Sequence, residues 1–266
     1  MKITVLCNDK AIEGFECEHG VSFFVELNGK SYLFDTGSTD VAVRNAGKLG
    51  INLSRIEFIV ISHGHYDHLG GLASVLQETG PKKVLVGEGG FERKFSETTL
   101  TSPEDGRTEY ENLGAIIETV GTSKEIADGI YVMTAAPLVT KERPGEKHVK
   151  IAEGIKNRDL FNDELSLSVV ENGNVTVITG CSHRGIGNIV KQASRFGKVK
   201  NVVGGLHLLH KTEEELEEIF EYLLSFDIDN FHIGHCTGDK VVKKIAERFP
   251  AEVVELMAGD SFEFHD

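Results

Sequence analysis

The chain has 266 residues, of which 40% are hydrophobic and 26% are charged. This length allows a sizeable buried core, and no stretch approaches the roughly 18 apolar residues that a membrane-spanning helix needs. The formal net charge is −14, and an acidic surface repels phosphate backbones, so general nucleic-acid binding is disfavoured.

The start of the chain predicts a strand at Met1–Leu6 and not the charged, then apolar, pattern of a signal peptide. The four cysteines, Cys7, Cys17, Cys181 and Cys236, contain no CxxC pair. A reduced, cytoplasmic setting is therefore the simplest interpretation.

A hairpin comes next, because Asn28-Gly29 lies between the strand candidates Val21–Leu27 and Tyr32–Phe34. After it, an apolar strand, a polar or histidine-bearing turn and a helix follow one another five times, which predicts strand–helix units of an α/β fold. In chain order the strands are Tyr32–Phe34, Phe58–Ile61, Val175–Ile178, Asn201–Val203 and Phe231–Ile233, and the helices lie near Val41–Leu49, Leu69–Gln77, Asn188–Phe196, after His207, and near Lys240–Phe249.

The helix after His207 is the best supported of these helices. Thr212 and Glu215 form a capping-box pattern at its start. Apolar residues then recur at helical spacing on one face.

The middle of the chain, Gly87–Asn162, has a different composition, rich in Glu, Lys, Thr and Gly. It has a strand candidate at Ile130–Met133, and we expect the segment to form an insertion or cap over the active site of a single domain spanning 1–266. Six basic residues against three Glu within Lys141–Arg158 suggest an anionic substrate. A solvated surface is the competing interpretation of that charge run.

Histidines gather where the predicted strands end. Ligand sites of open α/β sheets lie beyond the carboxyl ends of the strands. Six of the eleven histidines follow a strand in this way, and two aspartates accompany them. The residues at this edge are Asp35, His63, His65, Asp67, His68, His183, His207 and His235.

The run His63-Gly64-His65-Tyr66-Asp67-His68 is the densest group of metal-ligand side chains. Imidazole and carboxylate suit zinc, iron or manganese. Asp67 and His68 are adjacent, so on a turn they point apart and can serve different ions, which favours two metals over one. Two ions that share a water can deprotonate it near neutral pH.

This run, together with Asp35-Thr36-Gly37 upstream, resembles the signature of the metallo-β-lactamase superfamily. The resemblance implies an α/β (α+β) fold, a four-layer αββα sandwich with metals in the groove between the sheet edges. It implies that His63 and His65 bind one ion, that Asp67 and His68 bind the other, and that Asp35 orients them.

The resemblance also assigns His183 to the first ion and His235 to the second. Where the superfamily carries a bridging aspartate after a Thr-Gly pair, this chain has Cys181. Either the thiolate bridges the ions, or the ions share only water, or one ion binds weakly, or Cys181 is simply a small buried residue.

Three further residues are candidates near the site. His207 is a ligand, a partner of a ligand or a proton-transfer group, and we take it with Asp67 as a candidate catalytic residue. His19 overhangs the groove or lies in a surface loop. Arg184 is a candidate clamp for anionic substrate groups.

A narrower resemblance concerns five motifs, which are similar to those of the branch named for dihydropterin-methyl-ribofuranosylaminobenzene-phosphate synthase. They are Glu18–Ser22, Asp163–Leu167, Thr179–His183, Gly204–Leu208 and His235–Gly238. The branch also contains proteins called simply metal-dependent hydrolases.

These observations lead to three hypotheses about function. The first is a hydrolase that uses two divalent ions, zinc before iron or manganese, and a metal-activated hydroxide on a small anionic, phosphorylated metabolite. The second is a pterin-methyl transferase that releases diphosphate in methanopterin-type cofactor biosynthesis. The third is a non-catalytic or redox metal-binding protein. We expect no nucleic-acid or membrane partner, and the sequence leaves the oligomeric state open.

Overall fold

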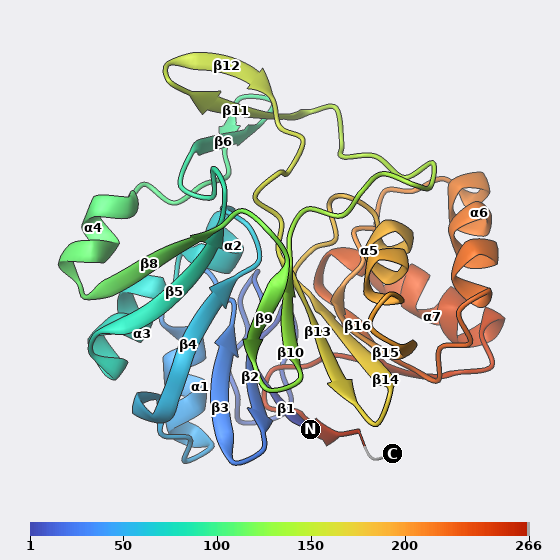
Figure 1. Cartoon of the computed structure of the whole chain (residues 1–266), viewed down its shortest axis with the longest axis horizontal. Coiled ribbons are helices and arrows are strands. Elements are labelled where there is room, and N and C mark those ends of the chain that lie inside the picture. Colours follow the sequence, from blue (N-terminus) through green and yellow to red (C-terminus); the bar gives the residue numbers. More distant parts are fainter. Residues whose placement is uncertain (265–266) are drawn as a thin grey trace. The chain divides into compact units, whose positions relative to one another are not determined.

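The computed structural model describes residues 1–264, and the chain divides into two compact units. The first unit comprises residues 1–121, 146–163 and 257–264, and the second comprises 122–145 and 164–256. Each unit contains a seven-stranded sheet and is described by itself. Figure 1 shows both units, with elements labelled where there is room.

The sheet of the first unit has the order β18-β1-β2-β3-β4-β5-β8. Its β18–β3 half is antiparallel, and β3, β4, β5 and β8 run parallel to one another. The strands are β1 Lys2–Cys7, β2 Ser22–Leu27, β3 Lys30–Phe34, β4 Ile56–Ile61, β5 Lys82–Gly87, β8 Ala115–Val120 and β18 Ser261–Glu263. The helices are α1 Val41–Lys48, α2 Tyr66–Leu69, α3 Leu72–Thr79 and α4 Arg107–Asn112, with a 3-10 turn at Leu53–Arg55.

Helices α1 and α3 cover one face of this first sheet. Ala42 and Ala46 of α1 and Leu72 of α3 share a buried apolar cluster with Leu33 of β3 and Ile59 of β4. Fully burying a side chain such as leucine contributes about 1.5–3 kcal/mol, so this layer holds the strands that carry Asp35 and the histidine run.

The first unit also contains a small antiparallel sheet of order β12-β11-β6-β7. Its strands are β6 Arg93–Ser96, β7 Thr99–Leu100, β11 His148–Ala152 and β12 Ile155–Arg158. Strands β6 and β11 pair although more than fifty residues separate them in the sequence. Part of the segment expected to be an insertion therefore folds as a separate sheet.

The sheet of the second unit has the order β17-β16-β15-β14-β13-β10-β9. Strands β14 to β17 are parallel and the remaining pairs are antiparallel. The strands are β9 Lys124–Ala127, β10 Ile130–Met133, β13 Ser166–Glu171, β14 Asn174–Thr179, β15 Lys198–Gly205, β16 Asn230–Gly234 and β17 Glu252–Glu255. The helices are α5 Ile186–Ala193, α6 Glu213–Leu224 and α7 Asp239–Arg248, with a 3-10 turn at His235–Thr237.

Helix α6 begins as the sequence predicts. The Thr212 hydroxyl accepts the Glu215 N–H at 3.2 Å, and the Glu215 carboxylate accepts the Thr212 N–H at 2.9 Å. Its buried side chains, including Phe220 and Leu223, join an apolar cluster with residues of α5, α7 and the sheet. The predicted strand at Ile130–Met133 is present as β10.

The middle segment 87–162 is thus shared among three sheets. Strand β8 extends the first sheet, β9 and β10 extend the second, and only the β6–β7 and β11–β12 hairpins form the small sheet. Whether that small sheet caps an active site stays a prediction.

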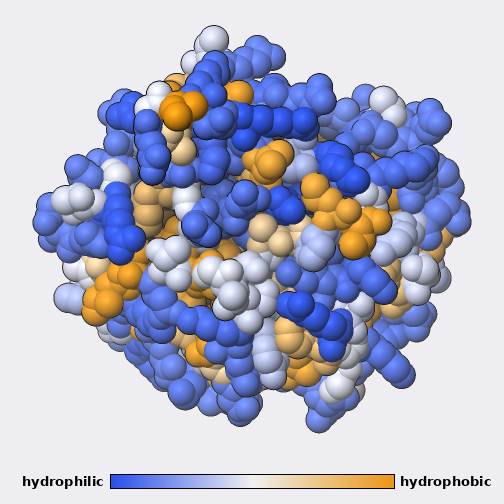
Figure 2. Space-filling model, turned by 45° about the horizontal axis from the view of Figure 1, so that its top comes forward, coloured by the Kyte–Doolittle hydropathy of each residue, from blue (hydrophilic) through white to orange (hydrophobic). Residues whose placement is uncertain are grey.

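The surface agrees with the acidic, polar composition. Figure 2 shows a mostly hydrophilic face with hydrophobic residues scattered over it. Among the helices of residues 1–264, none is both long enough and apolar enough to cross a membrane.

Candidate metal centre

The histidine run lies directly after β4 and leads into the short helix α2. Strand β4 lies beside β3 and parallel to it, so Asp35 emerges at the same sheet edge as His63 and the residues after it. In the first unit the structure brings together the predicted residues Asp35, His63, His65, Asp67 and His68.

Asp35 holds His68 in a fixed orientation. Its Oδ2 atom lies 2.7 Å from Nδ1 of His68, and both side chains are fully buried. The same carboxylate accepts the backbone N–H of Ser62 at 2.6 Å and the Ser62 hydroxyl at 2.7 Å. Asp35 itself has a left-handed φ of 59°, a conformation that is costly for a residue other than glycine and that clusters at functional sites.

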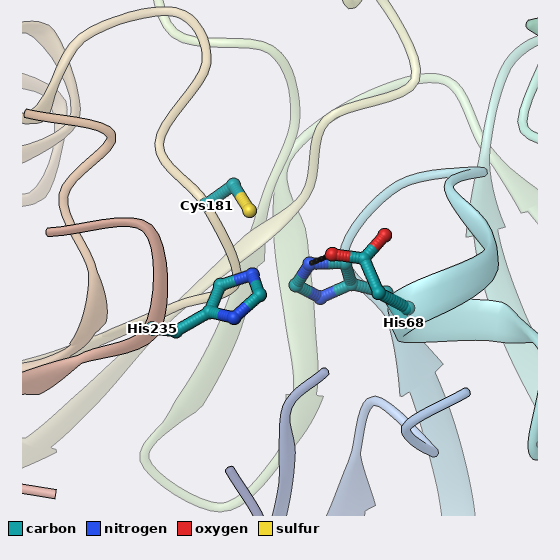
Figure 3. A group of neighbouring side chains, drawn as sticks. His68, Cys181 and His235 are labelled. Atoms are coloured by element: carbon teal, nitrogen blue, oxygen red, sulfur yellow. Dashed lines mark ion pairs between the residues drawn. The ribbon is translucent and has the colours of Figure 1, made fainter. Parts of the chain in front are cut away.

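With Nδ1 engaged, the other nitrogen of His68 faces Asp67. Nε2 of His68 lies 3.3 Å from Oδ2 of Asp67, the pair joined by the dashed line in Figure 3. A nitrogen and a carboxylate oxygen at this separation can bind a common cation. A histidine that hydrogen-bonds a carboxylate through one nitrogen and coordinates through the other is the usual arrangement around metal-binding imidazoles.

The electrostatics of these side chains differ from one histidine to the next. Burial lowers the pKa of His68, but Asp67 and Asp35 outweigh it and raise that pKa to about 9. Burial and the neighbouring His68 lower the pKa of His63 well below its usual value, and burial does the same to the pKa of His65. His63 and His65 are therefore neutral, as metal coordination requires.

The rings of His63, His65 and His68 are close enough to belong to one site. The His63 centroid lies 4.6 Å from that of His65 and 4.3 Å from that of His68. The donor set of imidazoles and carboxylates in the first unit thus fits a transition-metal ion.

Gly64 is needed because the chain is crowded where the run bends. A Cβ atom at this position would lie 2.0 Å from the carbonyl oxygen of Gly90. The Gly64 N–H donates to Oδ2 of Asp163 at 2.8 Å, so backbone and carboxylate together fix the path between His63 and His65.

Asp163 is itself held by a buried lysine. Nζ of Lys94 lies 2.9 Å from Asp163 and 2.6 Å from Asp159, and all three side chains are at most 2% exposed. The Lys94 ammonium also lies 5.3 Å from the ring centroid of Phe161. None of these residues has a role that the sequence predicts. Asp163 belongs to the motif Asp163–Leu167, but no pattern in the sequence singles out Lys94.

His148 is a second residue that the sequence analysis missed. It begins β11, and its ring lies 5.7 Å from that of His65 and 5.2 Å from that of Phe161. Phe161 also contacts His65, at 5.3 Å between ring centroids. The pairing of β6 with β11 brings His148 here, and no local pattern in the sequence announces that pairing.

His19 lies beside the predicted ligand Asp67. Its Nε2 atom is 3.5 Å from Oδ2 of Asp67, and its Nδ1 atom is 3.1 Å from Oδ2 of Asp9. The side chain is about half exposed, so it combines surface exposure with a contact to a candidate ligand.

The remaining candidates lie in the second unit, at the ends of three neighbouring parallel strands. Cys181, His183 and Arg184 follow β14, His207 follows β15, and His235 follows β16. The rings of His183 and His207 are 4.2 Å apart. Figure 3 shows Cys181 and His235 on their loops.

The backbone of these loops is strained at specific residues. Ser182, His207 and His235 have left-handed φ angles of 62°, 54° and 51°. Three such residues other than glycine, one after each of three adjacent strands, indicate that the loops are held in place by their surroundings.

Glu164 fixes the loop that carries His183. Its two carboxylate oxygens accept the N–H of His183 at 2.5 Å and the N–H of Arg184 at 3.0 Å. The Nε–H of Arg184 donates to the carbonyl of Ala136 at 2.8 Å. In the sequence, Glu164 stands out only as part of the motif Asp163–Leu167.

Three of the six basic residues of 141–158 lie close to acidic side chains. The pairs are Lys141 with Glu218, Lys150 with Glu92 and Arg158 with Glu146. These contacts favour the solvated-surface interpretation of the charge run.

His232 and His210 lie outside the set of candidate ligands. His232 lies within β16, where burial lowers its pKa to about 4, and His210 is exposed. His265 lies outside the described residues.

The metallo-beta-lactamase superfamily model matches residues 16–159, which is more than half of the chain. The chain belongs to the metallo-beta-lactamase superfamily. The predicted family and its mixed α/β fold are confirmed.

Individual relatives are similar to this chain over nearly its whole length. An uncharacterized protein of Methanocaldococcus jannaschii is 31% identical over 92% of this chain and 94% of its own length. The 7,8-dihydropterin-6-methyl-4-(beta-D-ribofuranosyl)-aminobenzene-5'-phosphate synthase of the same organism is 28% identical over 99% of this chain and 97% of its own length. A crystal structure of a metal-dependent hydrolase of the beta-lactamase superfamily is 34% identical, covers both chains in full and has a TM-score of 0.90.

These findings establish the fold of a superfamily of metal-dependent hydrolases and a set of side chains suited to metal binding. The assignment of each ligand, and the meeting of the two groups of candidates at one centre, stay predictions.

Proposed function

We propose that this chain is a hydrolase that uses two divalent ions, zinc first among them, on a small anionic, phosphorylated substrate. The observation that carries the proposal is the Asp35–His68–Asp67 series, in which a buried carboxylate orients an imidazole toward a second carboxylate. His63 and His65, neutral and adjacent, supply further ligands.

In this proposal the ligands are those that the sequence predicts. His63, His65 and His183 bind the first ion, and Asp67, His68 and His235 bind the second. The order of these residues along the chain and their places after strands support the assignment, as does membership of the superfamily. Bound divalent ions would lower the pKa of water and polarise a substrate oxygen.

The chain's own residues then have distinct tasks. Asp35 keeps the proton on Nδ1 of His68, so that Nε2 remains available as a ligand. Glu164 fixes the backbone at His183 and Arg184. His207, whose ring contacts that of His183, is the candidate for moving a proton, and Arg184 is the candidate for binding the anionic group.

The second candidate is the pterin-linked transferase activity. The relative that carries this name matches 99% of the chain, and the five motifs of the sequence analysis point to the same branch. In that reaction the site would hold the diphosphate leaving group, and the aromatic ring of the second substrate would be the nucleophile.

Two assays on zinc-loaded protein separate these activities. A hydrolase releases nitrophenol from bis-p-nitrophenyl phosphate, whereas the transferase releases pyrophosphate only when the pterin diphosphate and the aryl ribose phosphate are both present. A protein that binds metal without catalysing either reaction gives neither product, and that result would refute both proposals.

The matched variants are His68→Ala and His210→Ala. Elemental analysis should find two ions per chain in the wild type and in His210→Ala, whose side chain is exposed, and fewer in His68→Ala. An unchanged metal content in His68→Ala would show that this histidine is not a ligand.

A further inference from the structure

Tyr66 is the exposed member of the histidine run. It is 40% exposed, whereas His65 and Asp67 on either side of it are each 6% exposed. An isolated aromatic residue on a protein surface is common and needs no explanation. Tyr66 differs from such a residue because its neighbours in the sequence are candidate metal ligands, so its ring lies beside the proposed centre.

A second exposed ring lies next to that of Tyr66. The ring centroids of His19 and Tyr66 are 6.3 Å apart, and the two planes are inclined by 51°. The side chain of His19 is 56% exposed, and its Nε2 atom lies 3.5 Å from Oδ2 of Asp67. The two rings therefore form one surface beside the Asp67 carboxylate, which we call the His19–Tyr66 surface.

The loop that carries His19 packs tightly against the helix that carries Tyr66. The Val21 N–H donates to the carbonyl oxygen of Asp67 at 3.1 Å. A Cβ atom at Gly20 would lie 2.6 Å from the same oxygen. Glycine at position 20 thus allows the loop to approach closely enough for the two rings to meet.

Hydrogen bonds also hold each ring-bearing residue in place. One carboxylate oxygen of Asp9 lies 3.1 Å from Nδ1 of His19, and the other accepts the Gly20 N–H at 3.2 Å. The N–H of Tyr66 donates to the carbonyl of Thr101 at 2.8 Å. A surface that is already ordered loses little conformational entropy when a ligand binds to it.

The chemistry of the His19–Tyr66 surface suits a flat aromatic group. Aromatic rings attract one another in offset-stacked or edge-to-face arrangements, because the negative face of one ring meets the positive edge of another. A saturated ring of the same size has no such charge distribution and is not flat. An anionic substituent on a ring bound here would lie near the ions that we propose for the centre.

We propose that Tyr66 and His19 contact a planar aromatic group of the substrate and determine specificity for it. The inference rests on the proposed function, because the anionic group of the same substrate would bind at the proposed ions. It adds to that function a preference for aryl over alkyl esters of phosphate. Neither ring serves as a metal ligand in this proposal.

Two phosphate esters of equal charge and similar size test the inference. Phenyl phosphate carries a flat aromatic ring, and cyclohexyl phosphate carries a saturated one. Calorimetric titration of the zinc-loaded, full-length wild type should show tighter binding of the phenyl ester, by about 2- to 10-fold. Tyr66→Ala should lose this preference and His19→Ala should weaken it, whereas Tyr66→Phe, which keeps the ring, should retain it.

Leu113→Ala is the matched control, because Leu113 is 38% exposed and lies at the end of α4. This variant should keep the wild-type preference. Elemental analysis should find the wild-type zinc content in Tyr66→Ala, and a loss of zinc there would show that Tyr66 positions the metal ligands instead. Equal affinities of the wild type for the two esters, or an undiminished preference in Tyr66→Ala, would overturn the inference and leave the proposed centre standing.

A further measurement does not depend on the proposed ions. If the zinc-loaded protein bound neither ester, that result would count against the proposed function, and the surface would be tested with phenol and cyclohexanol, which carry no anionic group. In protein with isotope-labelled tyrosine rings, millimolar phenol should shift the nuclear magnetic resonance signal that is missing from Tyr66→Ala, and cyclohexanol should not. A Tyr66 signal that phenol leaves unmoved would refute the inference whatever the esters do.

Discussion

Oδ2 of Asp35 lies 2.7 Å from Nδ1 of His68, and neither side chain is exposed to solvent. The two residues are 33 positions apart and meet because β3 and β4 are adjacent parallel strands. The contact determines which nitrogen of His68 faces Asp67, so it links the sheet to the metal chemistry.

Asp35→Asn should weaken metal binding without unfolding the protein. The amide removes the charge that favours the Nδ1 proton and leaves the ring free to adopt the other tautomer. Loss of a hydrogen-bond partner of a metal ligand lowers the metal affinity by about 10–100-fold. Competition with a zinc chelator measures the change. Asp40→Asn, at an exposed position, should keep wild-type affinity, and equal affinities in both variants would refute the orienting role of Asp35.

Gly64→Ala should destabilise the fold. Its Cβ atom would lie 2.0 Å from the Gly90 carbonyl, and two stretches of backbone have to move apart to accommodate it. Overpacking of this kind costs about 1–3 kcal/mol in the free energy of unfolding, and the loss is measured by urea denaturation.

Gly47→Ala is the matched control for that variant. Gly47 is exposed within α1, and nothing lies within 4 Å of a Cβ atom there. Alanine should raise the free energy of unfolding by up to about 1 kcal/mol, because glycine is a poor helix former. If Gly64→Ala behaved in the same way, the Gly90 contact would not restrict this loop.

Lys94→Met should be strongly destabilising at neutral pH. The lysine lies between Asp159 and Asp163 with 1% of its side chain exposed, and its loss leaves two buried carboxylates without their cation. Breaking a buried pair in this way costs about 3–5 kcal/mol. Lys83→Met removes only the surface pair with Glu118, and urea denaturation should show a loss of less than about 1 kcal/mol.

The same ion pair predicts an alkaline pH dependence. Burial lowers the pKa of Lys94, but Asp163 and Asp159 outweigh it, so the pKa lies above its usual value. A raised pKa in the folded state stabilises the protein fully below the unfolded pKa of about 10.4, and the contribution is lost as the pH rises through the folded value. In that range wild-type stability should fall more steeply than that of Lys94→Met. Parallel curves would show that Lys94 does not contribute.

The histidine run could be found from the sequence because its members are local. Four ligand residues within six positions after an apolar strand can be recognised without knowledge of distant contacts. Asp35 and His235 could also be predicted as candidates, since the alternation of strands and helices predicts which residues reach a sheet edge.

Residues that reach the site through the pairing of distant strands could not be predicted from the sequence. His148 reaches His65 only because β6 pairs with β11, and Lys94 meets Asp159 through the same small sheet. The middle segment was treated as one insertion because its composition is uniform, whereas backbone hydrogen bonding divides it among three sheets. Register between distant strands depends on packing, which no local pattern in these segments reveals.

Glu164→Gln tests whether the loop after β14 is positioned by a carboxylate. The wild-type side chain accepts the N–H groups of His183 and Arg184, one on each oxygen. Glutamine keeps one acceptor and places an NH2 group against the other N–H, so the loop shifts and the imidazole of His183 leaves its position. We expect zinc affinity, measured by chelator competition, to fall about 10-fold or more. Glu247→Gln, on the exposed face of α7, should leave the zinc affinity unchanged. Wild-type affinity in Glu164→Gln would mean either that His183 is no ligand or that its loop needs no carboxylate. The metal content of His183→Ala decides between these two explanations.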